Sequence, residues 1–185
     1  MRRVKFSLWD ISFSLTFWFA AAFAVYAVYS VDSLYVIGAM LVHELSHILV
    51  ISLLGGRVEK IHLGLTEVNI RTQLDGIAPR RRLLIALAGP AANLITAAAV
   101  YGINPVFAAS NLIIGVFQLL PVASLDGGTI LEIMLRGQSA GLKKGISFII
   151  SFAVLLLGIL VLLVSKFNFS LLIVGLYLIF LTVTD

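Results

Sequence analysis

The chain has 185 residues, of which 61% are hydrophobic and 12% charged, with a formal net charge of +4 and a mean hydropathy of +1.10. A composition this apolar excludes a soluble globular domain and indicates a chain embedded in lipid. The absence of cysteine excludes thiol catalysis and metal sites with cysteine ligands.

Six apolar stretches have about the length that a membrane-crossing helix needs, although the fourth and sixth are short. They cover residues 11–30, 33–54, 83–104, 106–122, 146–164 and 170–184. The first follows a basic start, yet its apolar core is longer than that of a secretory signal, so we expect it to be retained. The sequence predicts an all-α polytopic membrane protein of about six transmembrane helices, organised as a single domain over residues 1–185.

The basic residues predict the orientation, because Lys and Arg concentrate in short cytoplasmic loops. The 13 basic residues, except Lys166, fall into three groups. One group precedes span one, one lies between spans two and three, and one lies between spans four and five. We therefore expect both termini in the cytoplasm. The basic pI of about 9.6 follows from this anchoring to the lipid bilayer, and no basic groove or stacking pattern predicts a nucleic-acid partner.

The second span contains the sequence His43-Glu44-Leu45-Ser46-His47. Two histidines four residues apart lie on one face of a helix and can bind one Zn²⁺, and the glutamate beside the first can act as a base toward a metal-bound water. At helical rise, His43 lies about 16 Å from the cytoplasmic end of its span. A metal-hydrolase motif at this depth predicts peptide-bond hydrolysis within the bilayer.

Residues 55–82 form the one extended segment that is not helical in pattern. Residues 61–65 alternate as a strand does, and the alternation resumes in a new register at Val68 and Ile70. We expect a small membrane-associated β-hairpin on the cytoplasmic side, to whose edge a substrate strand can add. His62 lies in this segment, and we interpret it as a surface residue, with a role as zinc ligand as the alternative.

A zinc ion bound by two histidines needs a third protein ligand, for which Asp126 is the better candidate. On an unbroken fourth helix, Asp126 would lie about 30 Å along, too far from His43. Pro121, Gly127 and Gly128 permit a break, so we expect a re-entrant loop of sequence LDGG that returns the carboxylate to the metal. The alternative is an interfacial Asp126 that caps a short helix over residues 129–135.

Two amides in the apolar spans are candidates for a functional role. Asn93 follows small residues that allow close helix approach, so we expect it to bond to a neighbouring helix, with substrate positioning as the alternative. Gln118 can donate to a substrate carbonyl or to a metal ligand. We add Gly127 and Gly128 to this substrate-positioning set.

Three motifs in order resemble the site-2 protease family of intramembrane zinc metalloproteases. They are His43–His47, the Ala-Gly-Pro-x-x-Asn run at Ala88–Asn93, and Pro121-x-x-x-Leu125-Asp126-Gly127-Gly128. The six-span layout looks like the branch that includes the stage IV sporulation FB protease. The resemblance implies zinc held by the two histidines and Asp126, Glu44 as base, and a transmembrane or membrane-tethered substrate. Regulatory membrane proteins are the other class of partner to expect.

The chain departs from this branch in the substrate-facing positions. Gln118, Ser124 and Thr129 stand where the branch commonly has Asn, Pro and Arg, and residues 65–68 read Leu-Thr-Glu-Val in place of a Pro-Phe-Gly-Gly-like turn. The ligands are retained, so these changes bear on substrate choice and turnover. We expect neither a PDZ insertion nor a C-terminal regulatory domain.

Two other functions use the same buried polar residues. In an ion or proton transporter, His43, Glu44, His47 and Asp126 would form the transport path, although no inverted repeat is evident. A catalytically inactive zinc-binding membrane protein would bind clients without cleaving them. The motif combination favours the protease.

Overall fold

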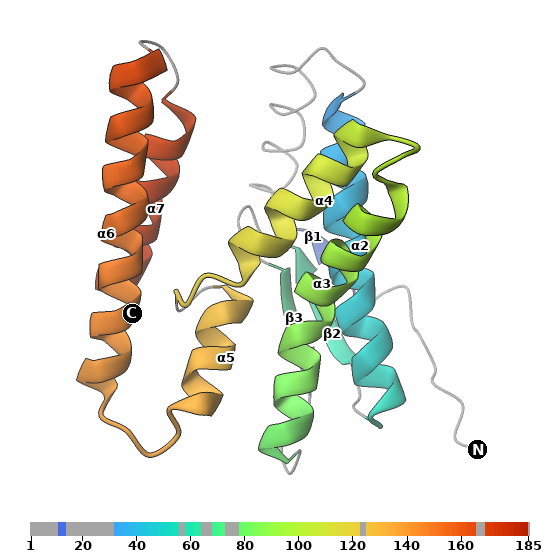
Figure 1. Cartoon of the computed structure of the whole chain (residues 1–185). Helices are drawn as coiled ribbons and strands as arrows, with labels where there is room; N and C mark the ends of the chain where they lie inside the picture. The colour runs from blue at the N-terminus through green and yellow to red at the C-terminus, as the bar shows by residue number, and fades with distance from the viewer. Residues whose placement is uncertain are drawn as a thin grey trace. The chain divides into compact units, whose positions relative to one another are not determined.

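The described part of the chain is mainly helical and divides into two compact units. The computed structural model describes residues 11–13, 32–55, 58–63, 68–72, 78–122, 125–165 and 169–184. The first unit runs to Gly115, and the second from Val116 to Asp185. Figure 1 shows the elements of both units with their labels. The single domain over residues 1–185 stays a prediction.

A three-stranded sheet belongs to the first unit. Strand β2 (Val58–Leu63) is central, with β1 (Ile11–Phe13) parallel to it on one side and β3 (Val68–Thr72) antiparallel on the other. The antiparallel register pairs Ile61 with Ile70. Because β2 has a neighbour on each edge, a further strand can add only to the outer edges of β1 or β3 among the described strands.

The first predicted span is wrong in its first three residues. We expect a helix over residues 11–30, but Ile11–Phe13 form β1, because their backbone groups join the ladder of β2. Residues 14–30 lie outside the described residues.

Helices α2 (Asp32–Leu53) and α3 (Pro79–Val100) pack side by side in the first unit (Figure 1). A proline opens α3, where no N–H partner is needed, and Ala78 before it is extended at φ −57° and ψ 145°. The buried residues of the two helices are mostly small or polar, which lets the backbones approach. They are Ala39, His43, His47 and Ile51 on α2, and Ala86, Gly89, Pro90, Asn93 and Ala97 on α3.

Helix α4 (Pro105–Gln118) begins at a well-formed cap and packs on α3. The side-chain oxygen of Asn104 accepts a hydrogen bond from the backbone N–H of Phe107 at 3.0 Å, which satisfies one of the free donors of the first turn. Near the other end, a β-carbon added at Gly115 would lie 3.1 Å from Asn93 Cβ and 3.2 Å from the carbonyl oxygen of Pro90. Glycine at this position therefore permits the close contact between the two helices.

The second unit contains α5 (Asp126–Met134), α6 (Ala140–Ser165) and α7 (Ser170–Thr184). Helices α6 and α7 lie side by side (Figure 1). A β-carbon at Gly158 would lie 2.6 Å from the backbone nitrogen of Leu172, so the helices meet backbone to backbone at this point. The buried hydroxyls of Ser151 and Thr182 lie 3.1 Å apart and form a hydrogen bond between the same helices.

The fourth helix breaks before Asp126, as expected, but the LDGG sequence is not a loop. Helix α4 ends at Gln118, and Asp126, Gly127 and Gly128 form the first turn of α5, with only Leu125 outside it in an extended conformation. The helix predicted over residues 129–135 thus starts three residues earlier. Asp126 is stabilised in this first turn by the partial positive charge of the helix N-terminus.

Gly127 allows α5 to begin this early without a steric clash. A β-carbon at position 127 would overlap the carbonyl oxygens of Leu119 and Leu120, within the same unit. Any other residue at Gly127 would push the first turn of α5 away from the segment that precedes it.

Three described helices are long and apolar enough to cross a membrane: Leu34–Leu53 of α2, α3 and α6. With 22 residues, α3 is about 33 Å long, and α6, with 26, about 39 Å. Helices α4 and α7 are apolar but shorter, as their predicted spans are. These helices indicate a membrane protein, and the count of six spans and the cytoplasmic termini stay predictions.

Candidate metal centre

The two histidines of the HExxH sequence lie one turn apart on the buried face of α2. His43 is 3% exposed and His47 8% exposed, whereas Leu45, between them in the sequence, is 61% exposed. Burying an imidazole is unfavourable unless its nitrogens find hydrogen-bond partners or a metal ion. The partners of the four ring nitrogens therefore indicate what this face of α2 is for.

The Nδ1 atom of each ring points to an acceptor. His43 Nδ1 lies 2.7 Å from Asn93 Oδ1, and His47 Nδ1 lies 2.8 Å from the backbone oxygen of Ile85. A carbonyl oxygen only accepts, so both Nδ1 atoms carry the proton and donate. In a neutral imidazole the other nitrogen, Nε2, then offers a lone pair, which is the form that binds a metal ion.

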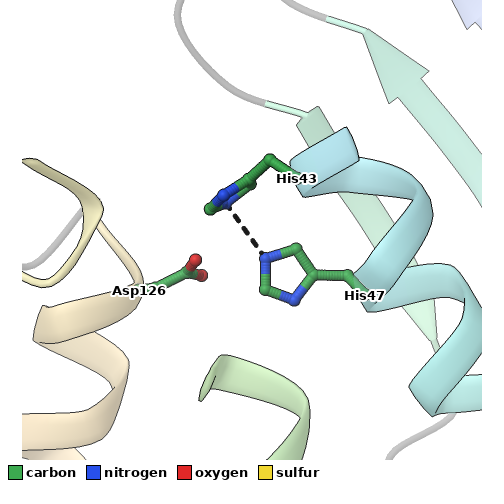
Figure 2. Close-up of side chains that lie close together, drawn as sticks. All are labelled: His43, His47 and Asp126. Carbon is green, nitrogen blue, oxygen red and sulfur yellow. Dashed lines mark hydrogen bonds between the residues drawn. The ribbon is translucent and has the colours of Figure 1, made fainter. Parts of the chain in front are cut away.

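The two Nε2 atoms face each other at 3.2 Å, with the ring centroids 4.8 Å apart and the ring planes at 76° (Figure 2). Two lone pairs at this distance repel unless the rings share a proton or a metal ion. In a tetrahedral zinc site with Zn–N bonds of about 2.0–2.1 Å, two ligand nitrogens lie about 3.3 Å apart. The spacing of the two Nε2 atoms therefore fits two ligands of one zinc ion.

The space in front of the rings depends on Gly89 of α3. A β-carbon at this position would lie 2.6 Å from both Cε1 and Nε2 of His43, and closer still to Nε2 of His47. A real side chain never approaches so closely, so any residue but glycine would displace the imidazoles or the helix. The glycine of the Ala-Gly-Pro run thus shapes the site, beyond allowing helix packing.

The other predicted site residues come from four helices, and Asn93 of α3 is one of them. Glu44 is half-buried on α2, and Asp126 is half-buried at the start of α5, in the second unit. Gln118 ends α4, and its Oε1 atom is buried with no hydrogen-bond partner in the described part of the chain. Gly128 is buried in the first turn of α5. A further ligand or substrate group that donates to Gln118 Oε1 would satisfy this atom.

Asn93 bonds to neighbouring helices, which confirms the interpretation of its amide. Its Nδ2 group donates to the backbone oxygen of Ala39 on α2 and to Oδ1 of Asn111 on α4, both at 2.9 Å. Sequence reasoning missed Asn111. The signal was present, because Asn111 is an amide in an apolar span, the criterion that singled out Asn93 and Gln118.

Comparison with known proteins finds a relative in sequence and a solved structure of similar fold. No family model matches the chain. A protein of Mycobacterium tuberculosis named "Putative zinc metalloprotease Rip3", from strains Erdman and H37Rv, is 31% identical over 127 residues. That match covers 60% of this chain and 32% of the relative, so the chain spans about a third of the length of the curated relatives it matches.

The solved structure named "Site-2 Protease from Methanocaldococcus jannaschii" has a similar fold. The TM-score is 0.63 at 21% sequence identity, and the match covers 98% of this chain and 93% of that chain. The chain therefore has a fold like that of a site-2 protease.

Proposed function

We propose that this chain is a zinc metalloprotease of the site-2 protease family, which hydrolyses a peptide bond in or near a transmembrane segment of a membrane-tethered substrate. The observation that carries the proposal is the pair of Nε2 atoms of the buried His43 and His47, which lie 3.2 Å apart on one face of an apolar helix. The relative named as a zinc metalloprotease supports the metal, and the site-2 protease fold supports the reaction.

Asp126 is the third zinc ligand in this proposal. Its carboxylate stands at the start of α5, where it is half-buried, and its sequence Leu-Asp-Gly-Gly belongs to the third of the three motifs. Two imidazoles and one carboxylate are a donor set that zinc takes in hydrolytic sites, with a fourth position left for water or substrate. The negative charge of Asp126 also offsets part of the charge of the ion in an apolar setting.

Glu44 is the general base. When bound, zinc supplies a Lewis acid that polarises the scissile carbonyl and makes a water molecule acidic enough to attack at neutral pH. The carboxylate of Glu44 takes a proton from the attacking water and returns it to the nitrogen of the leaving amine. The Nδ1 hydrogen bonds of His43 and His47 keep both rings in place during these steps. Gln118, Asn93, Gly127 and Gly128 stay our candidates for positioning the substrate.

The substrate segment must be extended before it is cut, because the carbonyls of a helix are already hydrogen-bonded. We infer that it adds as a strand to the outer edge of β3, one of the two outer edges of the sheet. Of these two edges, β3 is the one that lies in the segment 55–82, where the sequence predicts the substrate-binding hairpin. Ile70→Pro removes one backbone N–H from β3 and should lower cleavage while zinc content is retained. Unchanged cleavage by this variant would contradict the role of β3.

Within the family, we place the chain in the branch of the stage IV sporulation FB protease, as a multi-pass protein of a bacterial cell membrane with cytoplasmic termini. The three motifs in order support this placement, together with the concentration of basic residues in the predicted cytoplasmic loops.

The decisive experiment combines zinc analysis with cleavage of single-span test substrates by the protein in liposomes, for wild type and Glu44→Gln. A protease keeps one zinc per chain in the variant and loses cleavage by a factor of about 10² or more. A transporter instead loses ion flux, and an inactive zinc-binding protein is unaffected. Cleavage by Glu44→Gln at the wild-type rate would refute the proposed mechanism.

A further inference from the structure

A second buried amide lies behind the histidine pair. Asn111 of α4 is 0% exposed, as is Asn93 of α3. The Nδ2 group of Asn111 donates to the backbone oxygen of Phe107 at 2.9 Å, and its Oδ1 accepts from Asn93 Nδ2 at 2.9 Å. Asn93 Oδ1 in turn faces His43 Nδ1 at 2.7 Å. A continuous chain of hydrogen bonds thus runs from the backbone of α4 through two side chains to a candidate zinc ligand.

The backbone carbonyl groups at the ends of this series of hydrogen bonds determine the direction of every bond in it. The carbonyl oxygens of Phe107 and Ala39 can only accept, so an N–H group must face each of them. The amide of Asn111 must therefore present Oδ1 to Asn93. The amide of Asn93 then presents both hydrogens of Nδ2 to Ala39 and Asn111, and its Oδ1 to His43.

A reversed Asn93 would disable the histidine. Its Oδ1 would face the carbonyl oxygen of Ala39 and Oδ1 of Asn111, two contacts between acceptors. Its Nδ2 would face His43 Nδ1, which would have to accept, and the ring proton would move to Nε2. An Nε2 that carries a proton cannot bind a metal ion. The carbonyl oxygen of Ala39 opposes this reversal through one repulsive contact, and Oδ1 of Asn111 opposes it through a second.

We propose that Asn111 is a positioning residue for His43: acting through Asn93, it holds the imidazole in the tautomer and orientation in which Nε2 is available as a ligand. The proposal rests on the proposed zinc function of the two histidines. It assigns Asn111 a role that a buried amide used only for helix packing would not have, because packing does not depend on which end of the amide faces His43.

Two substitutions that resemble each other in shape, one to threonine and one to valine, distinguish a positioning role of Asn111 from a packing role. In Asn111→Thr the hydroxyl can donate to the carbonyl oxygen of Phe107, four residues before it, and accept from Asn93 Nδ2. Asn111→Val has nearly the same shape and can do neither. We expect the zinc dissociation constant to rise about tenfold or more in the valine variant, and by less than about threefold in the threonine variant, relative to wild type.

The second readout is the tautomer of His43 in the zinc-free protein, from ¹⁵N NMR of labelled histidine at a pH where the ring is neutral. Wild type and Asn111→Thr should show a protonated Nδ1, and Asn111→Val a mixture of the two tautomers. A valine variant that keeps the wild-type tautomer and zinc affinity would overturn the proposal, and so would equal loss in both variants.

The outcomes also distinguish this proposal from the proposed function. If wild-type protein binds no zinc, the zinc metalloprotease proposal fails, while the tautomer measurement still decides the role of Asn111. If the valine variant does not fold, as judged by thermal unfolding in detergent, the pair Asn111→Ser and Asn111→Ala provides the same contrast between a hydroxyl and a side chain with no polar group.

Discussion

Gly89 on α3 lies so close to His47 on α2 that the Nε2 atom of the ring occupies the space where a β-carbon of residue 89 would be. The same absent carbon would also contact the ring of His43. Both imidazoles can therefore keep these positions only if residue 89 has no β-carbon.

Gly89→Ala should lower zinc affinity by about tenfold or more, because the added methyl group forces the imidazoles from their positions and overpacking of this kind is rarely absorbed. Zinc titration of the purified protein measures the effect. Gly102→Ala is the matched control, since a β-carbon at Gly102 has nothing within 4 Å. Equal zinc affinity in both variants would show that the helices can separate without cost.

Zinc should stabilise the wild-type protein against heat. At a free zinc concentration 100 times the dissociation constant, the gain in the free energy of unfolding is about 2.7 kcal/mol, and chelation should remove it together with cleavage. The measurement is the unfolding temperature in detergent with and without zinc. His47→Ala should lose the response and Leu45→Ala, an exposed neighbour, should keep it. A zinc-dependent rise in the His47→Ala variant would contradict a site at this residue.

Asp126→Asn tests the third ligand. An amide binds zinc far more weakly than a carboxylate, so we expect zinc content below one equivalent and loss of cleavage. The control is Glu132→Gln, which removes an exposed acid from the same helix and should change neither quantity. Retention of a full equivalent of zinc by Asp126→Asn would remove Asp126 from the site.

Gly127→Ala should destabilise the second unit by about 1–3 kcal/mol, because the new methyl group overlaps the carbonyl oxygens of Leu119 and Leu120. Thermal unfolding measures the change, with Gly141→Ala as the control, where a β-carbon meets nothing within 4 Å. An unfolding temperature equal to that of the control would mean that α5 can shift to make room.

The features that depend on spacing within one helix were predictable. His43 and His47 share a face because residues four apart always do, and three of the predicted spans form helices long enough to cross a membrane. The break before Asp126 was predictable from Pro121 and the glycines. The start of α5 was placed three residues too late, because glycines read as a loop locally while here they permit close packing.

The sequence alone determined which reactive side chains are present: two imidazoles, a neighbouring carboxylate and one further acid in a strongly apolar chain. Only the tertiary structure decided how the imidazoles are used. The acceptors of their Nδ1 atoms lie 38 and 50 residues away along the chain, and Asn111 lies 18 residues beyond Asn93. Such contacts leave no periodic trace in the sequence, because they arise from the packing of separate helices. That packing holds the two rings with their Nε2 atoms 3.2 Å apart.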